Sequence, residues 1–135
     1  MKSKPVLTAE DVKKILAASE AHAVKNGWAV TIAVVDDGGH TLGMLRLDDA
    51  APISSYIAPA KGKTAALGRR ESAGYEEIIN NGRVAFLSAP QLEGMLEGGV
   101  PVVADGQIVG AVGVSGVKSS EDVEIARAGI AALGL

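Results

Sequence analysis

The sequence predicts an α+β fold in which amphipathic helices cover an antiparallel sheet. Two pairs of β-branched runs are each joined by a short turn rich in Asp and Gly, which is typical of antiparallel hairpins. Three other stretches repeat apolar residues every three or four positions, as amphipathic helices do. Because these helices need a partner for their apolar faces, we expect them to lie on the sheet. A chain of 135 residues fits a single domain, residues 1–135.

The first helix is expected to begin after Thr8, which has the residue type of an N-cap and is followed by acidic residues in the first turn. Apolar residues then recur at helical spacing until Asn26-Gly27, a typical helix C-terminus. His22 falls on or beside the buried stripe of this helix.

The middle of the chain predicts a hairpin and two helices. Strands are expected at residues 30–35 and 41–47, joined by a Gly-rich turn. Residues 52–67 keep helical spacing, and Pro59 is expected either to kink this helix or to begin it. A short helix is expected over residues 75–80.

The last third of the chain predicts three more strands and a helix. The strands are expected at residues 83–87, 100–104 and 107–114, and Asp105-Gly106 between the last two is a strong hairpin signal. Residues 119–122 have the composition of a helix start, and apolar residues at helical spacing follow them. The prediction is therefore five strands in all.

The composition excludes several classes of function. The formal net charge is −3 and the 13 basic residues are scattered, so we expect no nucleic-acid surface. The chain has no cysteine, which excludes disulfides, thiol nucleophiles and iron–sulfur clusters. No stretch has the roughly 18 apolar residues of a membrane span, and the first residues lack the apolar core of a signal peptide. We therefore expect a cytoplasmic protein that does not enter a membrane.

The glycines near the end of the chain do not form a phosphate-binding loop. Gly110, Gly113 and Gly116 match neither the dinucleotide fingerprint nor the nucleotide-triphosphate loop in spacing. Gly110 and Gly113 are instead expected to lie inside a strand, where a missing side chain lets another backbone approach closely. The acidic pair Asp36-Asp37 is interpreted as turn chemistry, because Asp side chains bond nearby backbone amides.

Four residues are candidates for ligand binding. His22 is either a core histidine satisfied by a hydrogen bond or a ligand for iron held in an apolar pocket. Arg46 and Lys61 are either solvated surface charges or partners for haem propionates or a small carboxylate. His40 is either a polar residue of an exposed hairpin or a second, weaker candidate ligand.

Five blocks of the sequence, taken in order, resemble the GlcG/HbpS-like family. This family is also called the haem-degrading domain family, and it includes the C-terminal domain of PduO-type cobalamin adenosyltransferases. The resemblance extends from about residue 11 to residue 132. The blocks are Ile32–His40, Arg46–Ala50, Lys61–Ala65, Gly98–Pro101 and Asp105–Gly116.

The resemblance implies a profilin-like fold, with a five-stranded antiparallel sheet and helices on both of its faces. It also implies homo-oligomers. Some members of the family bind haem, and a histidine on the first helix has been implicated as an axial ligand in the PduO-type branch. His22 is the position of this chain that resembles it.

These observations lead to three hypotheses about function. The first is a small haem-binding or ligand-binding protein, with His22 as metal ligand, Arg46 and Lys61 as anion partners and His40 as a further cofactor-binding candidate. The second is an enzyme, or an accessory subunit of a catabolic operon, that acts on a small carboxylate or carbonyl metabolite through Lys61, Arg46 and Asp36. The third is a structural partner of another enzyme.

Overall fold

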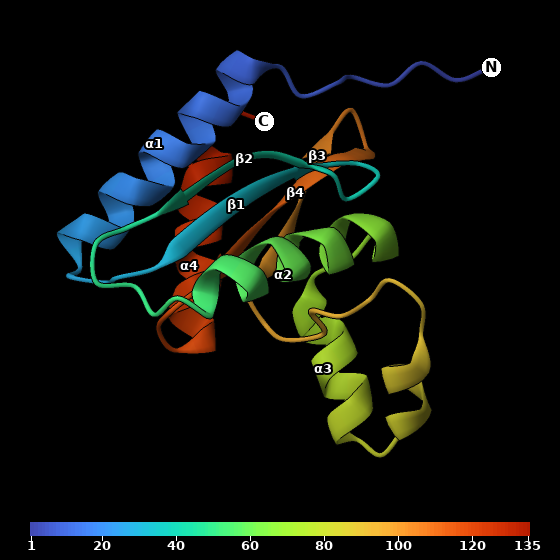
Figure 1. The fold of residues 1–135 in the computed structure, drawn as a ribbon. Coiled ribbons are helices and arrows are strands. Elements are labelled where there is room, and N and C mark those ends of the chain that lie inside the picture. The colour runs from blue at the N-terminus through green and yellow to red at the C-terminus, as the bar shows by residue number, and fades with distance from the viewer.

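A computed structural model of residues 1–135 contains four α-helices, one short 3-10 helix and one four-stranded sheet (Figure 1). The strands lie in the order β2-β1-β4-β3, and every neighbouring pair is antiparallel. None of the helices has the length and apolar character that crossing a membrane requires. In chain order the elements are α1 (Ala9–Lys25), β1 (Thr31–Asp36), β2 (Thr41–Arg46), α2 (Ser54–Gly68), α3 (Ser72–Asn80), η1 (Val84–Ser88), β3 (Gly99–Ala104), β4 (Gln107–Ser115) and α4 (Ser119–Ala131).

The α+β class is as predicted, but the prediction of five strands is wrong. The expected strand at residues 83–87 is instead the 3-10 helix η1. Its backbone bonds are local, from the Phe86 N–H to the Arg83 carbonyl and from the Ala89 N–H to the Phe86 carbonyl. The Phe86 ring packs against Tyr75 of α3 with 5.4 Å between ring centroids, which holds η1 on α3 and away from the sheet. The four apolar residues 84–87 are too short a run to distinguish a strand from a helical turn by periodicity.

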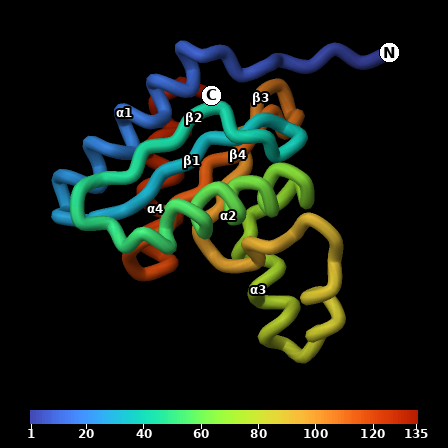
Figure 2. The backbone as a smooth tube through the Cα atoms, viewed as in Figure 1, coloured from blue at the N-terminus to red at the C-terminus, as the bar shows by residue number.

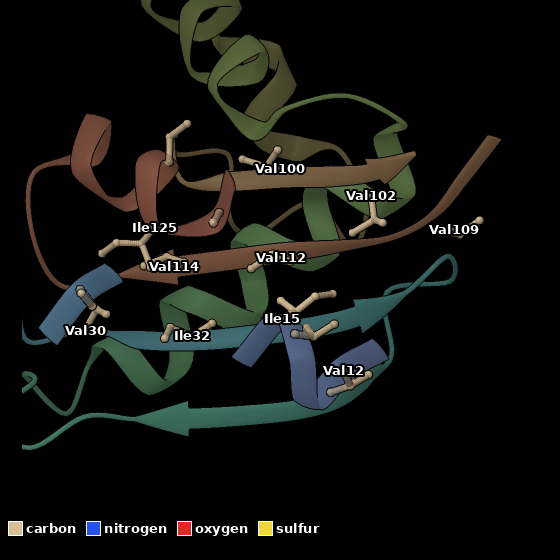
Figure 3. Close-up of a cluster of buried hydrophobic side chains, with 14 of the residues drawn as sticks. Val12, Ile15, Val30, Ile32, Val100, Val102, Val109, Val112, Val114 and Ile125 are labelled. Carbon is tan, nitrogen blue, oxygen red and sulfur yellow. The ribbon is translucent and has the colours of Figure 1, made fainter. Parts of the chain in front are cut away.

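Helices cover both faces of the sheet (Figures 1 and 2). The helices α1 and α4 pack on each other and on one face, where the main core lies (Figure 3). That core includes Ile15 of α1, Ile125 of α4 and the side chains of Ile32 and Val112 from the two central strands. The helix α2 covers the other face, where a smaller cluster of four buried residues includes Val35. The two central strands are therefore buried on both sides.

The helix α2 lies very close to the sheet because two glycines face each other. A Cβ atom built on Gly113 of β4 would lie 2.0 Å from the carbonyl oxygen of Ala58, and the Gly62 nitrogen would be 2.5 Å away. The expectation that Gly113 lies in a strand and admits another backbone is confirmed. Pro59 lies inside α2, so the helix does not begin there.

The N-terminal cap of α1 is also as predicted. Thr8 Oγ1 accepts the Asp11 N–H over 3.2 Å, and Asp11 Oδ2 accepts the Thr8 N–H over 2.8 Å. These reciprocal bonds form a capping box, which satisfies two backbone donors that the helix cannot pair internally. The cap fixes where α1 begins, and thereby the positions of His22 and the other residues near its C-terminal end.

Candidate functional site

His22 lies on the last turn of α1 and faces α4. Its Nε2 atom is 2.6 Å from Oε2 of Glu124, and its side chain is 27 % exposed. Trp28 follows α1, and its ring centroid lies 6.0 Å from that of the imidazole. The planes of the two rings are tilted by 57°. The contact with Glu124 leaves Nδ1 as the imidazole nitrogen available to a ligand. His22 is thus a partly exposed imidazole that is oriented by a carboxylate and flanked by an indole.

A groove of about 450 Å³ lies beside Trp28, between the end of α1 and the segment that follows β2. Arg46 lines this groove, but so do the carboxylates of Glu20, Asp48 and Asp49. The remaining lining residues are apolar residues or glycine: Val24, Gly27, Trp28, Ala29, Leu45 and Leu47. His22 is not among the lining residues, although its aromatic neighbour Trp28 is.

Lys61 is buried, with 4 % of its surface exposed. Its Nζ atom donates to the Val114 carbonyl oxygen over 3.0 Å and to Oδ2 of Asp122 over 3.1 Å. Burial raises the pKa of Asp122, and the ammonium group of Lys61 opposes that shift. Lys61 and Asp122 thus bond each other and nearby backbone groups inside the protein. Because Lys61 is buried, it does not lie on the surface, where a dissolved anion would meet it.

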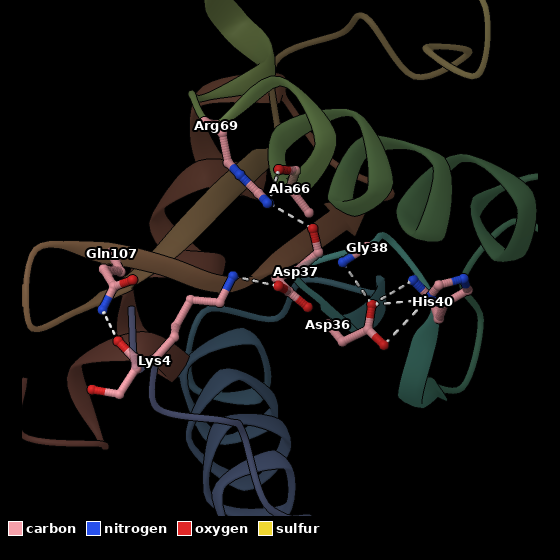
Figure 4. A network of polar contacts seen from close by, with 9 residues as sticks. Lys4, Asp36, Asp37, Gly38, His40, Ala66, Arg69 and Gln107 are labelled. Atoms are coloured by element: carbon pink, nitrogen blue, oxygen red, sulfur yellow. Dashed lines mark hydrogen bonds and ion pairs between the residues drawn. The ribbon is translucent and has the colours of Figure 1, made fainter. Parts of the chain in front are cut away.

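His40 lies in the turn between β1 and β2, where its side chain is 80 % exposed (Figure 4). Its Nδ1 atom is 3.1 Å from Oδ1 of Asp36, which also accepts the backbone N–H groups of Gly38 and His40. Partial burial raises the pKa of Asp36, but these N–H bonds outweigh it and hold the pKa below its ordinary value. The interpretation of Asp36 as turn chemistry is confirmed.

The four candidate residues do not meet in one cavity. Arg46 lines the groove beside Trp28, whereas no cavity is lined by His22, His40 or Lys61. The structure adds two residues to the surroundings of His22 that the sequence did not identify, Trp28 and Glu124. Glu124 lies 102 positions after His22 in the sequence, so no local pattern indicates that the two side chains touch. Trp28 is the only tryptophan of the chain, and this rarity is the one feature of the sequence that could have drawn attention to it.

The ligand set around His22 has one imidazole. No group of three or more His, Cys, Asp or Glu side chains is arranged to hold a bare metal ion. Protein sites for a bare transition metal ordinarily use three or four such side chains. Haem iron differs, because the porphyrin supplies most of its ligands and the protein adds one axial side chain.

Comparison with known proteins relates the chain to a family. A family model described as haem degrading protein HbpS-like matches residues 7–131. The protein GlcG of Escherichia coli strain K12 is 60 % identical over 115 residues, which cover 85 % of this chain and 85 % of GlcG.

Two solved structures share the fold along almost the whole chain. A double mutant of HbpS from Streptomyces reticuli has a TM-score of 0.90 at 34 % identity, over 100 % of this chain and 92 % of that chain. A PduOC–haem complex has a TM-score of 0.86 at 27 % identity, over 95 % of each chain. Because the family model spans nearly all of the sequence and GlcG shares 60 % of the aligned residues, this chain belongs to the HbpS-like family of haem degrading proteins.

Proposed function

We propose that this chain binds haem, with His22 as the axial ligand of the iron, and acts in the handling of haem or iron. The observation that carries the proposal is the contact between His22 Nε2 and Glu124 at 2.6 Å. Histidines that ligate metals almost always bond a carboxylate or carbonyl through their other ring nitrogen, which fixes the tautomer and raises the basicity of the ligand. Glu124 would provide this bond, with Nδ1 as the ligating atom.

Two features beside His22 support a flat aromatic cofactor as its ligand. One imidazole is enough for haem, and the indole of Trp28 stands beside it. The side chain of His22 is partly exposed, so an external ligand can approach it without unfolding of the helix. A bound haem would supply a redox-active iron centre with axial positions for protein or small ligands.

Arg46 is proposed as the partner of one haem propionate. It lines a groove that the indole of Trp28 also lines, and that indole stands beside His22. Three carboxylates share that groove and reduce its attraction for an anion. The contribution of Arg46 is therefore small, and Lys61 would contribute only if its buried contact with Asp122 opened. His40 remains a weaker candidate, on the exposed turn beside Asp36.

The family supports the proposal. The chain belongs to a family described as haem degrading, and a PduOC domain with the same fold has been crystallised with haem. The alternative hypothesis of an enzyme for a small carboxylate or carbonyl metabolite needs Asp36, Arg46 and Lys61 near one another. These three residues line no common cavity, so the geometry gives that reaction no support.

A haemin titration followed by absorbance tests the proposal. The native protein is expected to bind haemin saturably at one equivalent per chain, with a sharpened Soret band. The variant His22→Ala is expected to lose that band or shift it, because the axial ligand is removed. Arg46→Ala is expected to weaken binding by no more than about tenfold, as for an exposed ion pair.

His40→Ala serves as the matched control, since it removes the other imidazole of the chain from an exposed turn. It is expected to leave the Soret band unchanged. Saturable binding that persists in His22→Ala and disappears in His40→Ala would transfer the ligand role to His40. Adsorption of haemin without saturation in the native protein would overturn the proposal itself.

A further inference from the structure

The groove beside Trp28 has one wall that the C-terminal end of α1 holds in place. The Trp28 N–H donates to the Ala23 carbonyl oxygen over 2.9 Å. The Gly27 N–H donates to the Val24 carbonyl oxygen over 3.1 Å. These two bonds form a Schellman motif, in which Gly27 has a left-handed φ of 71°. Because Trp28 also packs against the main core, its indole is fixed where it lines the groove.

The other wall is a tight turn that follows β2 and lies beside the end of α1 (Figures 1 and 2). The Leu47 N–H donates to the Val30 carbonyl oxygen over 2.9 Å, which ties the start of the turn to the residue before β1. The Ala50 N–H donates to the Leu47 carbonyl oxygen over 3.2 Å and closes the turn. Asp49 has a left-handed φ of 69°, which Asp adopts more readily than most residues. The turn leaves Asp48 and Asp49 exposed where they line the groove.

The charged residues that line the groove are mostly acidic. Glu20, Asp48 and Asp49 contribute three carboxylates, and Arg46 contributes the one basic group. No ion pair of the structure includes any of these four side chains. Negative charge therefore exceeds positive charge in the groove, with three carboxylates against one guanidinium group. Such a surface attracts a cation and repels an anion.

The uncharged part of the lining distinguishes an organic cation from a metal ion. Val24, Leu45 and Leu47 give the groove an apolar surface beside the indole of Trp28. The three carboxylates are not arranged to hold a metal ion. An alkylated ammonium ion is attracted both by carboxylates and by an indole ring, and its alkyl groups can contact apolar side chains. The lining therefore matches a cation that carries apolar substituents.

We propose that this groove is a binding site for a small organic cation with a quaternary or alkylated ammonium group. The ammonium group lies against the indole of Trp28, and its charge is balanced by the acidic side chains of the lining, Glu20, Asp48 and Asp49. The groove of about 450 Å³ is within the usual size range of small-ligand sites. This proposal does not depend on haem binding, because it assigns no role to His22.

Tryptophan fluorescence tests the proposal directly, because Trp28 is the only tryptophan of the chain and lines the groove. Titration of the full chain with choline is expected to change the emission saturably at millimolar concentrations. The control ligand is the neutral carbon analogue of choline, in which a tert-butyl group replaces the trimethylammonium group. This analogue has the same shape without the charge, so it is expected to bind at least about tenfold more weakly. A change without saturation, or equal affinity for the two ligands, overturns the proposal.

The double variant Asp48→Asn with Asp49→Asn tests the acidic lining. Asn also tolerates a left-handed φ, so the turn is kept while two charges are removed. The affinity for choline is expected to fall by about tenfold or more, and that for the neutral analogue to stay unchanged. The matched control is Glu77→Gln with Glu93→Gln, which removes two exposed carboxylates that do not line the groove. Circular dichroism checks that each variant folds. Equal losses of choline affinity in the two double variants, or no loss in either, overturn the site.

Arg46→Ala separates this proposal from the proposed function. Removal of the one basic group of the groove is expected to strengthen choline binding by about threefold, because a repelling charge is lost. The same variant is expected to weaken haemin binding. The two titrations use different ligands and different signals, the tryptophan emission and the Soret band, so either proposal can fail while the other holds. Unchanged or weaker choline binding by Arg46→Ala overturns the charge balance proposed for the groove.

Discussion

Lys61 and Asp122 form an ion pair that connects the two helical layers across the sheet. Lys61 lies on α2 and Asp122 lies in the first turn of α4, on the opposite face. Their contact of 3.1 Å is almost completely buried, with 5 % and 3 % of the two side chains exposed. The remaining polar atoms also have partners, because Val114 accepts a bond from Lys61 and Val117 donates one to Asp122.

We predict that Lys61→Met lowers the free energy of unfolding by about 3–5 kcal/mol, since it leaves the carboxylate of Asp122 buried without its counter-charge. Denaturation by urea measures the change. The double variant Lys61→Met with Asp122→Asn is expected to recover part of the loss, because no isolated charge remains. Lys63→Met is the control on the same helix, where the partner is an exposed Gln91, and it should cost less than about 1 kcal/mol. A Lys61→Met protein as stable as the control would contradict the assignment.

We predict that alanine destabilises the protein at only one of the two facing glycines. Gly113→Ala puts a methyl group 2.0 Å from the Ala58 carbonyl oxygen, and overpacking of this kind costs about 3 kcal/mol or more. Gly62→Ala meets its nearest atom, the Gly113 nitrogen, at 3.3 Å. The helix propensity of alanine, worth up to about 1 kcal/mol, offsets that tighter contact. Thermal unfolding should show a large loss for Gly113→Ala and little change for Gly62→Ala, and equal losses would be evidence against the close approach.

The pKa of Asp36 predicts a dependence of stability on acid. Because the folded protein holds this pKa below its ordinary value of 3.8, the unfolded chain binds a proton more readily. The stabilisation is therefore present above pH 3.8 and is lost as the pH falls through the lower pKa of the folded state. We expect the melting temperature of Asp36→Asn to fall less steeply than that of the wild type below pH 4. Asp48→Asn is the control, because it removes an exposed carboxylate that does not accept these bonds. Parallel curves of melting temperature against pH for all three proteins would contradict the prediction.

Local patterns of the sequence predicted those parts of the fold that local interactions determine. The capping residue Thr8 correctly located the start of α1, and the Asp105-Gly106 turn correctly located the last hairpin. The predicted close approach at Gly113 also followed from a local feature, a glycine within an apolar strand. In each case the residues that decide the structure are neighbours in the chain.

The features that the sequence did not predict depend on contacts between distant residues. Nothing near residues 83–87 indicates that Phe86 packs on α3 rather than pairing in the sheet. Lys61 has the sequence surroundings of a surface lysine, and its burial follows from a carboxylate 61 positions away. The contact of His22 with Glu124 crosses 102 positions in the same way. For the candidate site, the sequence therefore indicated residue types, and only the fold identified their partners.

The contact between His22 and Glu124 leads to the last prediction, which concerns haem affinity. If Nδ1 is the iron ligand, Glu124→Ala removes the bond that orients the imidazole, and haemin affinity should fall by about tenfold or more. Glu124→Gln keeps a hydrogen-bond acceptor without the charge, so its loss should be smaller. Glu77→Ala removes an exposed glutamate from the distant helix α3 and is the control for net charge. Tighter binding by Glu124→Ala in the same titration would show that Glu124 competes with the iron for Nε2, and the ligating nitrogen would then have to be reassigned.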